Sequence, residues 1–543
     1  MRTHWIRVSG GLLGIILIIL MVFANALGLE SFSTWGVRRT LLLLAGITLL
    51  ASALFYKEDN LIGKTIHTSD GRFSVALSGL IFAILLVYLW YSSDGLWKTL
   101  TNETNYYDLQ ASAFAKGQLA LDVRPDAALL AFQDESLYEP SNREGIPMLW
   151  DATLYKGKYY LYWGPAPALL LTPMKWIYST DLGDKLLSLL FLAGTFLFLT
   201  LTLLSLWRDH FQNVPRWAVF AAVAFAGLVN PMPYILVEGR IYEAAIAAAQ
   251  FLLIGGFYFL LPAFDRPNQL RLAMAGLFFT LAAGSRTTLI PAIGVLSVIL
   301  LLWVLQTQRG HMISLVLSFA LPLMIGGISY GWYNYARFGS VTEFGLRYQL
   351  TSYNLYESLD ETFSLEYIAP NLYKTLLNPL EKRDAFPYLF PTRWSGPGWL
   401  AEGRPSFYLA YAEGITGILV SSPFVLFALL PLYRPRREMK WHLLALGLSF
   451  FATFVTLQAF FFVAMRYLLD AIPTLTLLTV VGFWHGFERF KNNKIHAAIG
   501  ILWLAHTIII SLVISISGNL EAFKILNPDL LKQMAWLFKM PFK

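Results

Sequence analysis

Residues 185–207 read KLLSLLFLAGTFLFLTLTLLSLW and carry no charged side chain after Lys185. A helix needs roughly 20 apolar residues to cross a bilayer, and this stretch has that length. Comparable apolar runs recur along the chain, so we predict an all-α polytopic membrane protein with about 13 transmembrane helices. The expected spans are 9–28, 40–55, 74–92, 185–207, 215–231, 242–262, 270–284, 286–305, 312–333, 412–433, 441–462, 470–488 and 495–516.

The composition excludes several classes of protein. Of the 543 residues, 56% are hydrophobic and 14% are charged, whereas soluble domains contain about 25% charged residues. Soluble enzymes, nucleic-acid binders and disordered scaffolds are therefore excluded. The net charge of +7 is assigned to cytoplasmic loops rather than to nucleic-acid binding, because basic residues collect there in membrane proteins. The chain has no cysteine, which excludes disulfides, thiol catalysis and cysteine-based metal sites.

The distribution of Lys and Arg over the short loops predicts the orientation. If the N-terminus is placed in the cytoplasm and the spans alternate, most Lys and Arg residues of the short loops fall on the cytoplasmic side. This is the distribution expected for a membrane protein, because basic residues collect in cytoplasmic loops. We expect a multi-pass protein of the cell membrane, with its active site and C-terminus outside the cytoplasm, and with the first apolar run retained as a helix. The predicted parts are N-terminal transmembrane helices (1–92), an extracytoplasmic loop with juxtamembrane helices (93–184), central transmembrane helices (185–333), a second extracytoplasmic loop (334–411), C-terminal transmembrane helices (412–516) and an extracytoplasmic amphipathic tail (517–543).

Proline content separates one apolar segment from the spans. The segment YLYWGPAPALLLTPMKW contains Pro165, Pro167 and Pro173, and proline interrupts the hydrogen bonds of a helix. We therefore expect residues 163–178 to lie as a helix along the outer surface.

Carboxylates are the candidate catalytic groups. The histidines fall on the cytoplasmic side or inside a span, so an outer active site has no histidine base. The first long loop contains WKTLTNETNYYDLQASAFAKG (97–117), in which Glu103 and Asp108 flank the start of a helix that Gly117 is expected to end. These two acids either cap that helix or act in catalysis. Asp151 precedes the aromatic segment that includes Tyr160, whose tyrosines either form an interfacial belt or contact a substrate.

Three arginines lie at helix ends on the predicted outer side, although most Lys and Arg residues of the short loops lie on the cytoplasmic side. Arg240 lies in PYILVEGRIYEAA near Glu238, Arg286 in AAGSRTTLIPA, and Arg466 in AMRYLLDAIP with Asp470 one turn later. Arginine offers a fork of donors suited to phosphate oxygens, so these residues are candidate ligands of a lipid phosphate. The alternative is that each reaches to solvent or pairs locally, Arg240 with Glu238 and Arg466 with Asp470. Further candidates are Arg347 and Tyr348 in the second long loop.

The ordered set of motifs resembles the GT-C glycosyltransferase superfamily, whose members include the lipid A aminoarabinose transferases and the protein O-mannosyltransferases. Glu103, Tyr106 and Gly117 match the family's acidic, tyrosine and glycine positions, whereas Asn102 stands where the family has an aspartate. Three later segments follow in the family's order: YYLYWGPAPALLL (159–171), LAMAGLFFTLAAGSRTTLIPAIGVL (272–296) and MRYLLDAIPTL (465–475), which holds Tyr467. The resemblance covers roughly residues 74–490.

The resemblance implies an integral-membrane glycosyltransferase that transfers a sugar, with inversion, from a polyprenyl-phosphate donor to an extracytoplasmic glycan, lipid or protein acceptor. The expected base is Glu103, ahead of Asp108 and Asp151. The expected phosphate ligands are Arg240, Arg286, Arg466 and Arg347. The expected substrate contacts are Asn102, Tyr106, Tyr160, Glu238, Tyr348 and Tyr467. Some family members use a divalent metal held by carboxylates, but this chain has no clear Asp-x-Asp, so we expect no metal or other cofactor. The alternative is a non-enzymatic transporter or flippase of lipid-linked glycans.

Overall fold

Long apolar helices dominate the chain. The computed structural model describes residues 2–22, 24, 36–55, 71–97, 100, 102–177, 181–433, 436–490 and 494–539. Within these ranges, seven helices are long and apolar enough to cross a membrane. They are α4 (Gly71–Ser92), α8 (Asp184–His210), α10 (Ile241–Asp265), α12 (Ile290–Thr307), α13 (Met312–Phe338), α18 (Lys440–Gln458) and α20 (Lys494–Gly518). The prediction of a helical membrane protein agrees with this architecture, whereas the count of about 13 spans stays a prediction.

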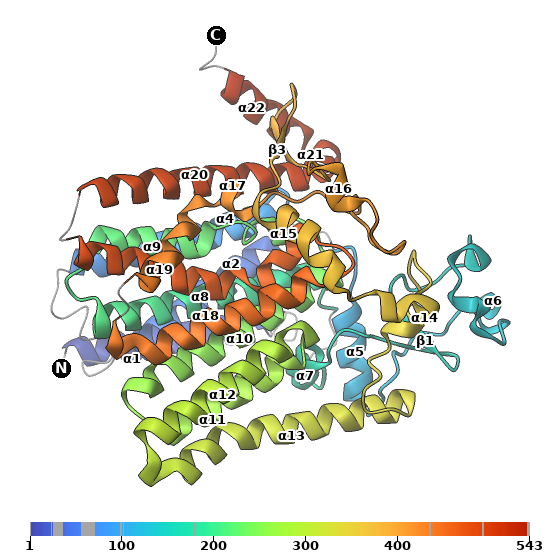
Figure 1. Ribbon diagram of the computed structural model, residues 1–543, viewed down its shortest axis with the longest axis horizontal. Coiled ribbons are helices and arrows are strands. Elements are labelled where there is room, and N and C mark those ends of the chain that lie inside the picture. Colours follow the sequence, from blue (N-terminus) through green and yellow to red (C-terminus); the bar gives the residue numbers. More distant parts are fainter. Residues whose placement is uncertain are drawn as a thin grey trace.

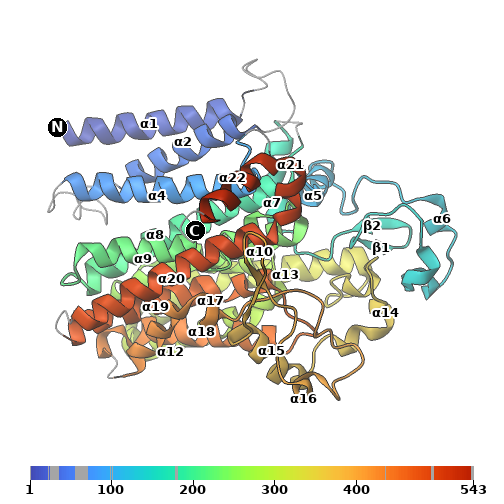
Figure 2. The same cartoon turned by 90° about the horizontal axis from the view of Figure 1, so that it is seen from above.

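Further helices complete the bundle, which Figures 1 and 2 show as long rods with roughly parallel axes. The helices α8 and α10 pack closely on each other, and α10 also packs on α11 (Gln269–Ala283). The two N-terminal helices, α1 (Arg2–Val22) and α2 (Val37–Phe55), lie at one edge of the bundle in Figure 2. The other additional helices are α9 (Arg216–Leu228) and α19 (Ile472–Arg489). The last part of the expected span 9–28 lies mostly outside the described residues.

The expected continuous helix over 412–433 is wrong. The structure has the short helix α17 (Ile418–Ser421) followed by the 3-10 helix η9 (Pro423–Leu432). Pro423 explains the break, because a proline disfavours the helical conformation in the residue before it, and Ser422 has φ −141° and ψ 61°. The backbone of η9 lies against Gly482 of α19, where a methyl group would collide with the carbonyl of Phe427. This close approach fixes η9 on α19.

The first long loop contains several short elements. They are α5 (Tyr106–Ala115), α6 (Ala127–Leu130), η1 (Glu135–Tyr138), η2 (Pro140–Arg143), the antiparallel hairpin of β1 (Thr153–Tyr155) and β2 (Lys158–Tyr160), and α7 (Ala166–Lys175). The helix expected before Gly117 is confirmed, and Gly117 follows it with φ +71°. The helix expected within 163–178 is also present as α7, whose 10 residues are too few to cross a bilayer.

The second long loop lies against the first. The backbone N–H of Asp151 donates to the carbonyl of Leu350 at 2.9 Å, and the N–H of Leu350 donates back to Ala152 at 2.9 Å. The second loop contains η6 (Leu346–Tyr348), α14 (Leu355–Ser358), η7 (Leu359–Glu361), η8 (Leu365–Tyr367), α15 (Ile368–Leu376), the hairpin of β3 (Leu380–Lys382) and β4 (Leu389–Pro391), and α16 (Gly398–Ala401). The expectation of a purely α-helical chain therefore missed two short hairpins, which lie in the loops.

Elements of both loops lie at one end of the bundle, where α5, α6, α14 and β1 stand at the right of Figure 1. We call this end of the bundle the loop end. It holds Asp184, Arg240 and Arg286, which lie at or next to the starts of α8, α10 and α12. These helices run from there to the opposite end of the bundle, which we call the far end. The tail that was expected to be helical contains α21 (Leu520–Leu526) and α22 (Pro528–Lys539). The ring of Phe523 in α21 contacts Trp90 of α4, with centroids 5.5 Å apart.

The orientation is testable because the chain has no native cysteine. Ser141→Cys places a thiol in the first long loop, and Gly310→Cys places one in the turn between α12 and α13; both positions are exposed. We expect a membrane-impermeant maleimide to label Cys at 141 in intact cells, and Cys at 310 only after permeabilisation. Labelling of both positions in intact cells would contradict the predicted orientation.

Candidate functional site

Asp151 is a buried carboxylate at the loop end. Its backbone has φ +59°, a left-handed conformation that is rare for a residue other than glycine. The hydroxyl of Tyr242 in α10 donates to its carboxylate. Burial raises the pKa of Asp151 to about 6, while Thr351 and the charges of Arg466, Arg143 and Arg240 act in the opposite direction. A carboxyl group with such a pKa is suited to accept a proton near neutral pH.

Aromatic rings from three segments contact one another beside Asp151. Trp163 lies 5.5 Å from the ring of Tyr242 and 6.3 Å from the ring of Tyr106 in α5. The hydroxyl of Tyr106 donates to the carbonyl of Trp150 at 2.9 Å. The segment that carries Trp163 lies so close to the end of α11 that a methyl group at Gly164 would collide with the carbonyl of Gly284. The absence of a side chain at Gly164 permits this contact. Tyr106, a predicted substrate contact, therefore lies next to Asp151.

Arg466 lies beside the same tyrosine. It belongs to η11 (Met465–Asp470), which precedes α19. Its guanidinium lies over the rings of Tyr242 and Tyr467, at 5.1 and 5.0 Å from their centroids. It forms an ion pair with Glu413 at 2.6 Å. The pairing of Arg466 with Asp470 that the sequence suggested is therefore wrong, because the two residues engage different partners.

Arg240 and Arg286 complete the group. Arg240 pairs with Glu238, as the sequence suggested, and with Glu243 at 3.1 Å, and it lies 5.3 Å from the ring centroid of Tyr242. Arg286 pairs with Asp470 at 2.8 Å, an acid that also accepts a hydrogen bond from Thr288 at 3.2 Å. Its guanidinium lies 5.5 Å from the ring centroid of Tyr467. The structure thus brings together three of the predicted phosphate ligands, and we call Arg240, Arg286, Arg466, Tyr242 and Tyr467 the arginine–tyrosine cluster.

The acidic partners of these arginines differ in exposure. The side chains of Glu413 and Glu238 are 36% and 38% exposed, whereas that of Asp470 is fully buried. An exposed carboxylate can turn into solvent at little cost, whereas a buried one left without its partner is strongly unfavourable. Glu413 and Glu238 can therefore turn away from Arg466 and Arg240, while the pairs of Arg240 with the buried Glu243 and of Arg286 with Asp470 are fixed.

A cavity of about 440 Å³ adjoins the cluster. It lies between the segment 162–165, the turn from α11 to α12 and one face of α13. Trp163 and Thr287 line the cavity. They also connect it to the arginine–tyrosine cluster, because Trp163 contacts Tyr242 and Thr287 follows Arg286 in the chain. Its lining is mostly apolar and aromatic, with Arg337 as a charged member whose guanidinium donates to Leu161 and Asn334.

Asp108 has structural partners. Its carboxylate lies 2.5 Å from the ammonium of Lys175 in α7 and accepts a hydrogen bond from the N–H of Leu182 at 2.8 Å. The pKa of Asp108 is raised by burial, and the contacts with Lys175 and Leu182 oppose this effect. Asp108 therefore ties α5 to α7 and to the segment before α8.

Glu103 and Asn102 lie before α5, so Glu103 is oriented independently of that helix. Glu103 is exposed, and its N–H donates to the carbonyl of Gly239 at 3.0 Å, beside Arg240 in the chain. The side-chain oxygen of Asn102 accepts from the N–H of Lys185 in the first turn of α8 at 3.2 Å. Asn102 thus supports the start of a helix.

Tyr160, Arg347 and Tyr348 make their contacts in a different group of rings. Tyr160 and Tyr348 lie 5.5 and 6.0 Å from Phe338, at the end of α13. Arg347 lies 5.7 Å from the ring centroid of Tyr356 in α14. These contacts join the two long loops.

The residues that sequence reasoning missed come from distant segments. Asp184 accepts hydrogen bonds from the hydroxyl of Thr104 at 2.5 Å and from the N–H of Tyr106 at 2.9 Å, so it caps α5 from another helix. The sequence offered a reason to consider Tyr242, since it lies two residues after Arg240 in the stretch PYILVEGRIYEAA. It offered no reason to consider Glu413, because this residue lies 53 positions before its partner Arg466.

The comparisons with known proteins add little to this geometry. No family model matches the sequence, and no curated protein matches it significantly. The chain is similar to the apo form of the oligosaccharyltransferase of Archaeoglobus fulgidus, at 11% identity and a TM-score of 0.43, over 82% of this chain and 56% of that chain. It is also similar to the same organism's oligosaccharyltransferase AglB in complex with an inhibitory peptide and a dolichol-phosphate, at 12% identity and a TM-score of 0.42, with the same coverage. The chain spans just over half the length of these proteins, and such low TM-scores do not establish a shared fold or activity.

The raised pKa of Asp151 predicts how stability depends on pH. Because the pKa is about 6 in the folded protein and about 3.9 in an unfolded chain, the folded state binds the proton more tightly between these values. The melting temperature of the wild type should therefore fall relative to Asp151→Asn as the pH rises from about 4 to 6, by an amount equivalent to at most about 3 kcal/mol. Thermal unfolding in detergent measures this. Asp122→Asn, at an exposed position in the same loop, is the control, and parallel curves for wild type and Asp151→Asn would contradict the prediction.

Proposed function

We propose that this chain is an integral-membrane glycosyltransferase that uses a polyprenyl-phosphate-linked sugar and an extracytoplasmic acceptor. The observation that carries the proposal is the position of the buried Asp151 beside Arg466 and Arg240, next to a mostly apolar cavity. Transfer from such a donor needs a base for the acceptor, cations for the leaving phosphate and an apolar surface for the lipid. The loop end offers all three kinds of group within one set of contacts.

In the proposed reaction, the acceptor hydroxyl attacks the anomeric carbon of the sugar. Its proton passes to the carboxylate of Asp151, the new bond forms between the acceptor oxygen and the anomeric carbon, and the bond from that carbon to the phosphate oxygen breaks. The electron pair leaves with the polyprenyl phosphate. Positively charged donors aimed at the leaving oxygen stabilise the transition state, which is the role we assign to Arg466 and Arg240.

Asp151 replaces Glu103 as the first candidate for the base. Asp151 is buried among the arginines and has a raised pKa, whereas Glu103 is exposed and Asp108 is held by Lys175. The carboxylates of Glu238, Glu243 and Glu413 are each paired with an arginine, so the cluster offers paired acids rather than a free set of ligands for a divalent cation. The proposal therefore includes no metal in the transfer step.

Binding of the lipid phosphate tests the role of the arginines. Arg466→Gln should weaken the binding of a short-chain polyprenyl phosphate about tenfold or more, because a hydrogen bond to a charged group contributes about 1.5–3 kcal/mol. Arg240→Gln should weaken it less, because Arg240 keeps the buried Glu243 as a second partner. Affinity is measured on protein in nanodiscs, with the corresponding polyprenol as the ligand that lacks phosphate.

Arg383→Gln is the matched control for these variants. Arg383 is exposed in the second long loop and pairs with Glu381, so its replacement should leave affinity unchanged. If Arg466→Gln and Arg240→Gln bind the polyprenyl phosphate like the wild type, the cluster is not the phosphate site.

Transfer assays with labelled polyprenyl-phosphate sugars test the base. Asp151→Asn should lower the rate of transfer about 100-fold or more, since general-base catalysis contributes about 10²–10⁴-fold, while polyprenyl phosphate still binds. Glu103→Gln and the exposed control Glu144→Gln should retain the wild-type rate. Full activity of Asp151→Asn would remove this mechanism, and loss of activity in Glu103→Gln alone would assign the base to Glu103. If no donor sugar is transferred but lipid-linked glycan crosses the bilayer of proteoliposomes, the chain is a flippase instead.

A further inference from the structure

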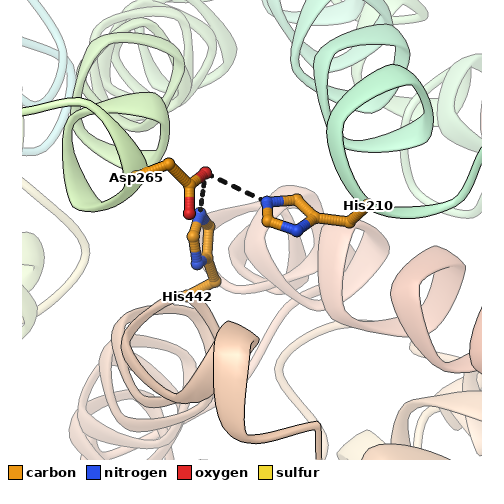
Figure 3. A group of neighbouring side chains, drawn as sticks. All are labelled: His210, Asp265 and His442. Atoms are coloured by element: carbon orange, nitrogen blue, oxygen red, sulfur yellow. Dashed lines mark hydrogen bonds and ion pairs between the residues drawn. The ribbon is translucent and has the colours of Figure 1, made fainter.

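Two histidines and an aspartate meet at the far end of the bundle (Figure 3). His210 is the last residue of α8, Asp265 is the last residue of α10, and His442 lies in the first turn of α18. The Oδ2 atom of Asp265 lies 3.0 Å from Nε2 of His210 and 3.3 Å from Nε2 of His442. One possible ligand atom from each residue lies within 4.8 Å of the other two. Three separate helices thus direct one potential metal ligand each to a common point.

The two separations from Asp265 suit a tetrahedral ion, and the two imidazole nitrogens lie within 4.8 Å of each other. Zinc binds imidazole nitrogen and carboxylate oxygen at about 2.0–2.2 Å, which places neighbouring ligand atoms about 3.3–3.6 Å apart in a tetrahedron. The two measured separations from Asp265, 3.0 and 3.3 Å, are close to this value. Two imidazoles and one carboxylate form a ligand set that zinc and other late transition metals prefer, whereas magnesium and calcium prefer oxygen ligands.

Burial of His442 gives a second, independent indication. Only 1% of this residue is exposed. Its Nε2 lies 3.3 Å from Asp265 without the geometry of a hydrogen bond, and its Nδ1 has no hydrogen-bond partner among the described residues. Buried polar groups without such partners are rare in folded proteins and call for an explanation. Figure 3 shows the ring of His442 directed toward Asp265. A bound cation would satisfy the nitrogen that points at Asp265.

Space and access are also present. A cavity of about 10 Å³, room for one water-sized sphere, is lined by His210, Asp265 and His442. Ser205 and Asp209 line the same cavity. The side chain of Asp265 is 33% exposed, so an ion can reach the site from solvent.

We propose that His210, Asp265 and His442 bind one divalent late transition-metal ion, with water as a further ligand, and that this ion ties the far ends of α8, α10 and α18 together. The role is structural: the site lies at the opposite ends of α8 and α10 from Asp184 and Arg240. It is independent of the proposed transfer reaction.

Zinc binding to the full-length protein tests the proposal. The protein is purified in nanodiscs without a histidine tag, stripped with a chelator and titrated with Zn²⁺ against a chromophoric competitor, and bound zinc is counted by mass spectrometry after desalting. We expect one zinc per chain and a rise in melting temperature on binding. His210→Gln and Asp265→Asn should each weaken zinc binding at least about tenfold and reduce the thermal shift. Both positions are at least partly exposed, so these variants are expected to fold even if a variant of the buried His442 does not.

His311→Gln is the matched control. His311 is an exposed histidine in the turn between α12 and α13, and its replacement should leave the affinity and the thermal shift unchanged. Magnesium at the same concentration should not raise the melting temperature. Three results would each overturn the proposal: less than one zinc per chain at saturation, unchanged zinc affinity in both His210→Gln and Asp265→Asn, or an equal thermal shift with magnesium.

Discussion

The lack of water inside a bilayer constrains this structure more than any other factor. Backbone N–H and C=O groups in hydrocarbon must bond to each other, so the chain crosses as helices and confines its irregular segments to the ends of the bundle or to the interior of the protein. The break between α17 and η9 follows this rule, because η9 is packed against Gly482 of α19. The charged clusters follow it too: the Arg286–Asp470 pair lies at the start of α12 and α19, and the His210–Asp265 pair lies at the ends of α8 and α10.

Much of the fold was predictable from sequence because length and hydropathy determine which segments can be long helices. Local chemistry predicted α5 equally well, since the left-handed Gly117 stops it where expected. The same reasoning failed over 412–433, where apolar composition indicated a span but Pro423 divides the segment. It also missed the β1–β2 hairpin, whose strands are only 3 residues each. Hydropathy therefore predicted the long elements, and the short ones depend on turns and on contacts between the two loops.

The sequence predicted which residues belong to the candidate site better than it predicted which of them pair with each other. The charge bias correctly singled out Arg240, Arg286 and Arg466 as residues of one end, and the structure groups them around Tyr242 and Tyr467. Sequence proximity then gave the wrong partner for Arg466, because the residue one helical turn away, Asp470, faces Arg286 instead. The bond from Tyr242 to Asp151 joins residues 91 positions apart, and no local pattern encodes such a contact.

The two ends of the bundle carry different chemistry on the same helices. α8 begins with Asp184, which caps α5, and ends at His210 after 27 residues. At 1.5 Å per residue these ends are about 40 Å apart. Charges separated by that distance interact weakly where solvent and salt can screen them, so we expect an ion at His210, Asp265 and His442 to have little electrostatic effect on Asp151. An influence of one end on the other would then be mechanical. It would pass through the packing of α8 on α10, since α10 carries Tyr242 at one end and Asp265 at the other.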